Sequence, residues 1–346
     1  GQFIDEAMGV FQEWKRKIPC DIIIYSTLVK GFASSNDPDR ALALYADMKA
    51  EGLQLNHVVY TALIAAFARQ GQTKRADAIL AEMTAAGCKP NAITYSVLIR
   101  GHCVRGDLSA ALDLFRQFSA LGFKADSIIF NTLLDGCVEH SSWGLADMLL
   151  EEMKKHNFGH SNFTLSIMVK MWSKRRELQK AIDAVYDALK LPYGGRTKVG
   201  KRMQRQNVDV HVGSCLIGAC IHNLAPVLAM DIFEDMRTWK DFDGPDTNTY
   251  NALVCGLVRH GYVREALRYA EEALSVLRTS YDGRTLHASA VRQLCQGLVR
   301  ADLADEFGAS LRANLLNAGA PFQERWLAKD LGYRVRLQPG SSECYQ

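Results

Sequence analysis

Apolar residues recur along the chain in a pattern that repeats every 35 residues. Within residues 57–91, apolar positions at three- and four-residue spacing predict a first helix that contains Tyr60 and ends at Gly71. A second apolar stripe predicts another helix, with Thr73 as its N-cap and Gly87 at its end. Each block is therefore predicted to form two antiparallel helices.

Two columns of residues keep this period through successive blocks. One column is aromatic or aliphatic and the other is alanine, as expected for buried positions. Their members are Tyr25, Tyr60, Tyr95, Phe130 and Leu165, and Ala41, Ala76, Ala111, Ala146 and Ala181. One helical pair cannot bury its apolar face alone, so successive pairs are expected to stack. The predicted fold class is all-α: an α-solenoid, a right-handed superhelix of stacked two-helix repeats.

Motifs within the blocks resemble those of a known repeat family. The stretches VVYTALI, ITYSVLIRGHC and NTYNALVCGLV resemble the opening of pentatricopeptide repeats, and AILAEMTAAGCKPN resembles their ending. The Trp-Leu-Gly signature of the related tetratricopeptide repeat is absent. The chain is identified as a member of the plain class of the pentatricopeptide repeat family, which has no catalytic tail.

The shared register also predicts where each repeat begins and ends. The predicted segments are a partial repeat at 1–21, four regular repeats at 22–161, a repeat at 162–209 with a basic insertion at 190–206, repeats at 210–246 and 247–284, and a degenerate repeat with a C-terminal tail at 285–346. The chain opens at Gly1 without Met, so a targeting peptide is expected to have been removed or to precede this sequence.

Composition and charge exclude only a few classes of function. The net charge is +3, but a solenoid can concentrate charge on one face, so nucleic acid is not excluded. The nine cysteines form no C-x-x-C pair and are interpreted as reduced, buried small residues rather than metal ligands. No apolar run reaches the ~18 residues of a membrane span. Catalytic motifs are absent too, so neither an enzyme nor a cofactor is expected.

Two columns of small polar residues are candidates for binding. The first column directly follows the aromatic column and is expected to point into the concave groove, because first helices line that face. Such residues are poor helix formers but versatile hydrogen-bonding groups, which favours a functional role. The second column closes each repeat, where an N-cap or turn role is the alternative. The first column is Ser26, Thr61, Ser96, Asn131, Ser166, Ser214 and Asn251, and the second is Asn56, Asn91, Asp126, Ser161, Asp209 and Asp246.

The family resemblance implies that these columns together read one RNA base per repeat. By the family's rules, Ser or Thr with Asn implies A, Ser or Thr with Asp implies G, Asn with Asp implies U, and Asn with Ser implies C. Asn251 alone implies a pyrimidine, so the implied RNA is A-A-G-C-G-G-pyrimidine. The family pattern also implies side chains that wedge between bases, two places before the aromatic column. They are Ile23, Val58, Ile93, Ile128 and Phe163, while His211 and Asn248 depart from the aliphatic norm.

The insertion at 190–206 is strongly basic and contains no acidic residue. It is either a solvated loop or a phosphate-binding arm that becomes ordered on RNA. The phosphate-binding candidates are Arg196, Lys198, Lys201, Arg202 and Arg205.

Two functions of different classes remain open. The first is a single-stranded RNA-binding protein of a mitochondrion or plastid, acting in RNA processing, stability or translation. The second is a structural subunit of an organellar ribosome or another large complex, contacting mainly protein or rRNA. The two polar columns favour the first function, whereas the modest charge and the irregular second half of the chain favour the second.

Overall fold

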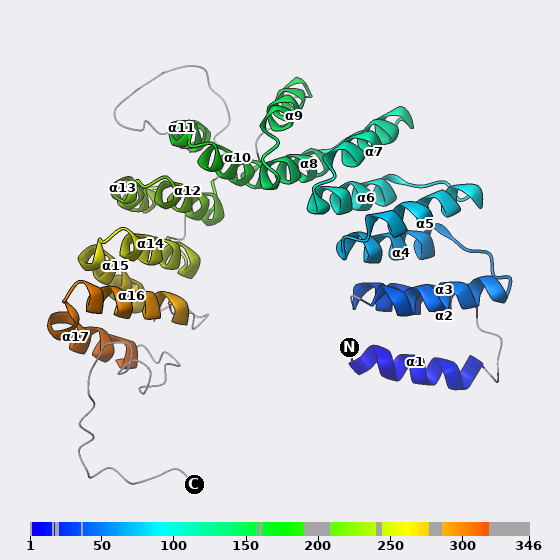
Figure 1. Cartoon of the computed structure of the whole chain (residues 1–346), viewed down its shortest axis with the longest axis horizontal. Coiled ribbons are helices and arrows are strands. Elements are labelled where there is room, and N and C mark those ends of the chain that lie inside the picture. Colours follow the sequence, from blue (N-terminus) through cyan, green and yellow to red (C-terminus); the bar gives the residue numbers. More distant parts are fainter. Residues whose placement is uncertain are drawn as a thin grey trace, which may run out of the picture. The chain divides into compact units, whose positions relative to one another are not determined.

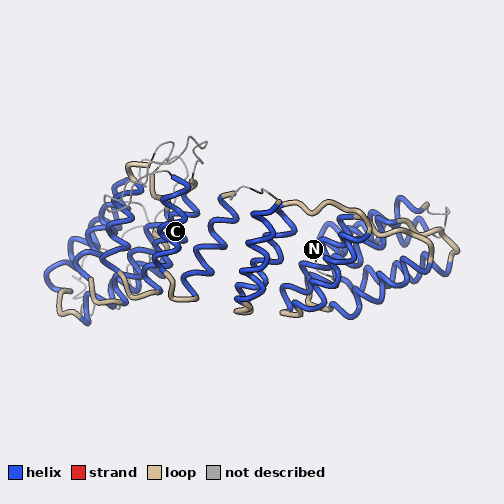
Figure 2. The backbone as a smooth tube through the Cα atoms, turned by 90° about the horizontal axis from the view of Figure 1, so that it is seen from above, coloured by secondary structure: helices blue, strands red, loops and turns tan. Residues whose placement is uncertain are grey.

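The structure is a computed structural model that describes residues 2–15, 17, 21–35, 37–156, 158, 161–189, 208–239, 244–276 and 286–317. Within those ranges every regular element is an α-helix, and Figure 2 shows helices joined by loops without a strand. The chain divides into two compact units, residues 1–159 and 160–346. Each unit is a stack of helical pairs, so the predicted α-solenoid class is confirmed.

The first unit begins with a single helix and continues with four pairs (Figure 1). Its helices are α1 (Gln2–Lys15), α2 (Ile22–Ser34), α3 (Pro38–Ala50), α4 (His57–Arg69), α5 (Thr73–Ala85), α6 (Ala92–Arg105), α7 (Leu108–Ala120), α8 (Ser127–Glu139) and α9 (Trp143–Lys155). The first helices α2, α4, α6 and α8 pack side by side in that order, and each also packs against its own second helix.

The second unit continues the same plan with four pairs (Figure 1). Its helices are α10 (Asn162–Lys174), α11 (Leu178–Leu189), α12 (Val210–His222), α13 (Pro226–Met236), α14 (Thr247–Arg259), α15 (Val263–Val276), α16 (Ala288–Arg300) and α17 (Ala304–Asn317). The first helices α10, α12, α14 and α16 pack in sequence. The last pair lies in the segment that was expected to hold a degenerate repeat.

The two apolar columns form the core, as the sequence predicts. All five column alanines, which lie on second helices, are fully buried. The aromatic column is buried as well, and its rings pack edge to face with neighbouring rings, as in the pairs Tyr45–Tyr60 and Tyr95–Phe118.

Glycine ends the helices where the pattern placed it, but the predicted start of α5 is corrected by one residue. Gly71 and Gly87 both have positive φ, +69° and +75°, a conformation that glycine adopts without strain. Thr73 is the first residue of α5 rather than its N-cap, which is Gln72. The Thr73 hydroxyl is instead hydrogen-bonded by Arg105 at 3.1 Å, which ties α5 to α6.

Candidate nucleic-acid interface

The residues that close each repeat are N-caps of the following first helix. Asn56 accepts hydrogen bonds from the N–H groups of Val58 and Val59, both at 3.1 Å. Asp126 accepts in the same way from Ile128 and Ile129. The remaining members, Asn91, Ser161, Asp209 and Asp246, each accept from the N–H three residues ahead. This satisfies backbone donors that have no partner inside the helix, so the N-cap interpretation is confirmed for the whole column.

An Asn or Asp side chain that caps a helix in this way keeps a second polar atom that is not needed for the cap. The bonds to Asn91 and Asp246 use only the Oδ1 atom, so the amide nitrogen of one and the second carboxylate oxygen of the other are not part of the cap. Asp126, Ser161, Asp209 and Asp246 are exposed, and Asn56 and Asn91 are half-buried. The cap therefore orients a polar group at the edge of the groove without consuming it.

The column that follows the aromatic position is less exposed than expected. Asn131, Ser166 and Asn251 are only 4–7% exposed, and the other members are half-buried. The expectation that the whole column points freely into the groove is corrected, because adjacent first helices pack side by side and this position falls at their junction. Asn251 illustrates the point, since it donates to the Thr247 carbonyl at 2.6 Å and accepts from the His287 N–H at 2.9 Å.

The hydroxyl groups of this column have two kinds of partner. Ser26, Ser96 and Ser166 each donate to a carbonyl of their own helix, at 3.0, 2.7 and 2.8 Å. Thr61 and Ser214 are instead hydrogen-bonded to a threonine of the next first helix, Thr94 and Thr249 respectively. These two threonines were not predicted from the sequence as candidate site residues.

The predicted wedge residues are large apolar side chains exposed to solvent. Ile23, Ile93 and Ile128 are 63–69% exposed, and Val58 and Phe163 are also exposed. Each is the second residue of a first helix, two residues after the N-cap. His211 and Asn248 occupy the same position in α12 and α14 and are exposed as well. In the repeats that begin with α2, α4, α6, α8 and α10, one exposed apolar side chain therefore lies beside the two polar columns.

Exposed basic residues on first helices, among them Lys30 and Arg100, were missed from the sequence. Lys30 and Arg100 lie four residues after Ser26 and Ser96, one turn further along α2 and α6. The four-residue spacing places them on the same helix face as the polar column. This four-residue spacing from the polar column could have identified them in the sequence. The basic insertion with Arg196, Lys198, Lys201, Arg202 and Arg205 lies outside the described residues.

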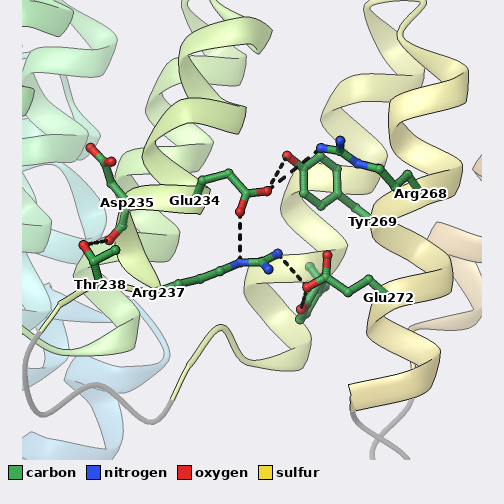
Figure 3. Close-up of polar contacts among 8 residues, drawn as sticks. Glu234, Asp235, Arg237, Thr238, Arg268, Tyr269 and Glu272 are labelled. Carbon is green, nitrogen blue, oxygen red and sulfur yellow. Dashed lines mark hydrogen bonds and ion pairs between the residues drawn. The ribbon is translucent and has the colours of Figure 1, made fainter.

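A separate polar cluster joins the second helices α13 and α15 (Figure 3). Arg237 contacts Glu234 at 3.2 Å and Glu272 at 2.6 Å. The hydroxyls of Tyr250 and Tyr269 donate to Glu272 and Glu234, at 2.7 and 3.0 Å. Burial, followed by these carboxylates, raises the pKa of both phenols, so they remain protonated donors. The cluster links the second helices of two neighbouring repeats.

The cysteines of the described ranges carry free thiols. Cys103, Cys137, Cys220 and Cys295 are buried, and burial raises the pKa of Cys103 to about 12 and that of Cys137 to about 11. Across the same ranges no group of three or more His, Cys, Asp or Glu side chains could hold a metal ion. None of the described helices has the length and apolarity needed to cross a bilayer.

Comparison with protein-family models identifies the class of the chain. The pentatricopeptide repeat domain model matches residues 43–104, and the PPR repeat family model matches 125–174. The single PPR repeat model matches 23–53, 93–123 and 248–275. These matches together cover about half of the chain, and the chain belongs to the pentatricopeptide repeat family. A search of curated proteins gave no significant match.

Two solved structures share this fold. Two crystal structures of the pentatricopeptide repeat protein PPR10 in complex with an 18-nt psaJ RNA element match with a TM-score of 0.65 and 19% identity. Each match covers 95% of this chain and 45% of that chain, so this chain spans less than half of their length. Nuclear proteinaceous RNase P 2 from A. thaliana matches with a TM-score of 0.41 and 14% identity, covering 89% of this chain and 82% of that chain.

Proposed function

We propose that this chain is a sequence-specific, single-stranded RNA-binding protein that reads about one base per repeat. The observation that carries the proposal is the row of exposed apolar side chains at Ile23, Val58, Ile93 and Ile128, one per repeat and each beside a hydrogen-bonding pair. Nucleic-acid bases have apolar faces and polar edges, so a base inserted between two such side chains presents its edge to that pair.

Each pair consists of one residue from each polar column. The pairs Ser26–Asn56 and Thr61–Asn91 read A, and Ser96–Asp126 reads G. Asn131–Ser161 reads C, the pairs Ser166–Asp209 and Ser214–Asp246 read G, and Asn251 reads a pyrimidine. The target would be A-A-G-C-G-G-pyrimidine, and PPR10, which shares the fold, is itself crystallised with RNA.

Positive charge near the groove would hold the phosphates. Lys30 and Arg100 are exposed one turn beyond Ser26 and Ser96. The five basic residues of the insertion at 190–206 are proposed to add further phosphate contacts. Such contacts contribute binding energy that weakens as salt rises, and they carry no sequence information.

The protein would act in a mitochondrion or plastid, where it would support RNA processing, stability or translation by binding rather than by catalysis. The competing role, a structural subunit of an organellar ribosome, predicts co-migration with ribosomal subunits that survives nuclease treatment. Binding to a free oligonucleotide with base preference favours the first role.

The decisive test changes one reading group in the third repeat. Ser96→Asn keeps Ile93 and Ile128 in place, and should move the preference at the third base from G towards U. Contacts to base edges are worth about 1–3 kcal/mol in discrimination, which is measurable with the four singly changed oligonucleotides at fixed salt.

The matched control is Ser119→Asn on the second helix α7. Ser119 also donates to a carbonyl of its own helix, at 3.0 Å, and is exposed, so the chemical change is the same outside the polar columns. The control should rank the four bases as the unmodified protein does. If Ser96→Asn also leaves the ranking unchanged, the columns do not read RNA.

A further inference from the structure

The third residue of successive first helices alternates between apolar and threonine. From α4 to α14 the column reads Val59, Thr94, Ile129, Thr164, Val212 and Thr249. All six side chains are buried. A buried hydroxyl needs a hydrogen-bond partner, so the threonines of this column must differ from the apolar members in what they contact.

Thr94 connects the two proposed base-reading residues of the second repeat. Its hydroxyl lies 3.0 Å from that of Thr61, on the preceding first helix. The same hydroxyl donates to Asn91 Oδ1, also at 3.0 Å. The reading pair Thr61–Asn91 is thus joined through one side chain that contacts both.

Thr249 makes the same connection in the second unit. It is hydrogen-bonded to Ser214 through the two hydroxyl groups. It also donates to Asp246 Oδ1 at 2.6 Å. The reading pair Ser214–Asp246 is therefore joined in the same way, by a threonine of the following helix.

Reading pairs that are followed by an apolar residue lack this connection. Val59, Ile129 and Val212 have no side-chain hydroxyl to offer. The preceding readers Ser26, Ser96 and Ser166 instead donate to carbonyls of their own helices. The hydrogen-bond partner of each reading hydroxyl therefore depends on whether the third residue of the next first helix is threonine or apolar.

The connection fixes which atoms donate in the second repeat. The Thr94 N–H also points at Asn91 Oδ1, at 3.0 Å, and an N–H must face an acceptor, which sets the orientation of the amide. Thr94 has one hydroxyl proton and gives it to that oxygen. Thr61 must then donate to Thr94, so it presents only lone pairs elsewhere, while Asn91 presents the N–H groups of its Nδ2.

The sixth repeat presents a different pattern of donors and acceptors. The Asp246 carboxylate can only accept, so Thr249 donates to it and Ser214 donates to Thr249. Ser214 and the second oxygen of Asp246 then both present acceptors. An acceptor beside a donor complements the N6 amine and N1 of adenine, whereas two acceptors complement the N1–H and N2 amine of guanine.

We infer that Thr94 and Thr249 are positioning residues that set the donor and acceptor pattern of the preceding repeat's reading pair, and so sharpen its choice of base. This inference rests on the proposed function, because it assigns a role within base reading. It explains why the bases implied for these two repeats, A and G, agree with the hydrogen-bonding pattern of the residues themselves.

The test removes one hydroxyl and follows two neighbouring bases. Thr94→Val should reduce the preference for A at the second position of AAGCGGU by about tenfold, or ~1.4 kcal/mol. Preference at the third position should be unchanged, although Ser96 lies on the same helix as Thr94. Thr249→Val should act likewise on the sixth position alone.

Three further variants separate positioning from simple loss of stability. Thr94→Ser keeps the hydroxyl and should restore the preference at the second position. Thr84→Val removes a hydroxyl that donates to the Leu80 carbonyl on α5 at 2.9 Å. It should leave the base preference unchanged at both the second and the third position. Val59→Thr should create the connection between Ser26 and Asn56 and raise the preference for A at the first position. This variant tests the positioning role even if Thr94→Val does not fold.

The outcomes distinguish this inference from the proposed function. If the unmodified protein shows no base preference for any oligonucleotide, the proposed function fails and the inference fails with it. If it discriminates and Thr94→Val discriminates equally well, or loses preference equally at the second and third positions, only the positioning role is overturned.

Discussion

A close contact between two neighbouring first helices gives a quantitative prediction about stability. Gly101 lies on α6 where this helix meets the end of α4. A methyl group at this position would stand 2.7 Å from the Ala68 Cβ and 3.1 Å from its Cα. Ala68 is buried, and its Cβ and Cα cannot move away by a side-chain rotation. The substitution Gly101→Ala must therefore push the two helices apart.

Two opposing effects determine how much Gly101→Ala changes the free energy of unfolding. Alanine in a helix interior is more favourable than glycine by about 1 kcal/mol. Overpacking a well-packed contact costs about 1–3 kcal/mol, and the upper part of that range applies because the clash includes a backbone atom. The expected net effect is a loss of ~1–2 kcal/mol in the free energy of unfolding.

The assay is urea unfolding followed by circular dichroism, with Gly218→Ala as the matched control. Gly218 also lies in the later half of a first helix, α12, but nothing stands within 4 Å of a methyl group placed there. The control should therefore gain stability, by up to about 1 kcal/mol. If Gly101→Ala were stabilising to the same degree, the argument that this glycine permits close helix packing would be refuted.

Two further predictions concern titratable groups. Because burial raises the pKa of the Cys103 and Cys137 thiols, iodoacetamide at pH 8 should leave both unlabelled in the native protein and label them after unfolding, as mass spectrometry can show. A hydrogen bond from Lys15, at 2.8 Å, lowers the pKa of Glu51, so this contact stabilises the packing of α1 above the unfolded pKa and is lost as the pH falls through the folded value. The protection of α1 amides against hydrogen exchange should fall as the pH drops through the lowered pKa of Glu51, and Glu51→Gln should remove that pH dependence.

The sequence predicted the features that depend on packing within one repeat. Ala76 and Tyr60 are buried, and the residues at the same two positions of the neighbouring repeats are buried as well, with the period of the chain. Gly71 ends a helix because its backbone conformation is local. Such features are determined by residues close in sequence, and the 35-residue period made them visible.

Features that depend on how one repeat meets the next were not predicted. The burial of Asn131, Ser166 and Asn251 depends on the rotation of each first helix against its neighbour, which a single repeat does not specify. The bond between Thr61 and Thr94 likewise joins residues 33 positions apart. The alternation of apolar residues and threonine was visible in the sequence, but its meaning required the distance between adjacent helices.

The wedge column bears on the choice between RNA and a protein partner. Folding does not explain why Ile23, Ile93 and Ile128 are exposed, since polar residues would serve equally well at the second position of a helix. Protein interfaces usually present contiguous apolar patches.

Here each apolar side chain is followed by a hydrogen-bonding pair such as Ser96–Asp126, and the same arrangement is repeated at the next first helix. A ligand that alternates flat apolar faces with polar edges at a regular spacing complements this arrangement, and a single-stranded nucleic acid has that character. The spacing of the apolar side chains, rather than the net charge of +3, is therefore the stronger argument for RNA.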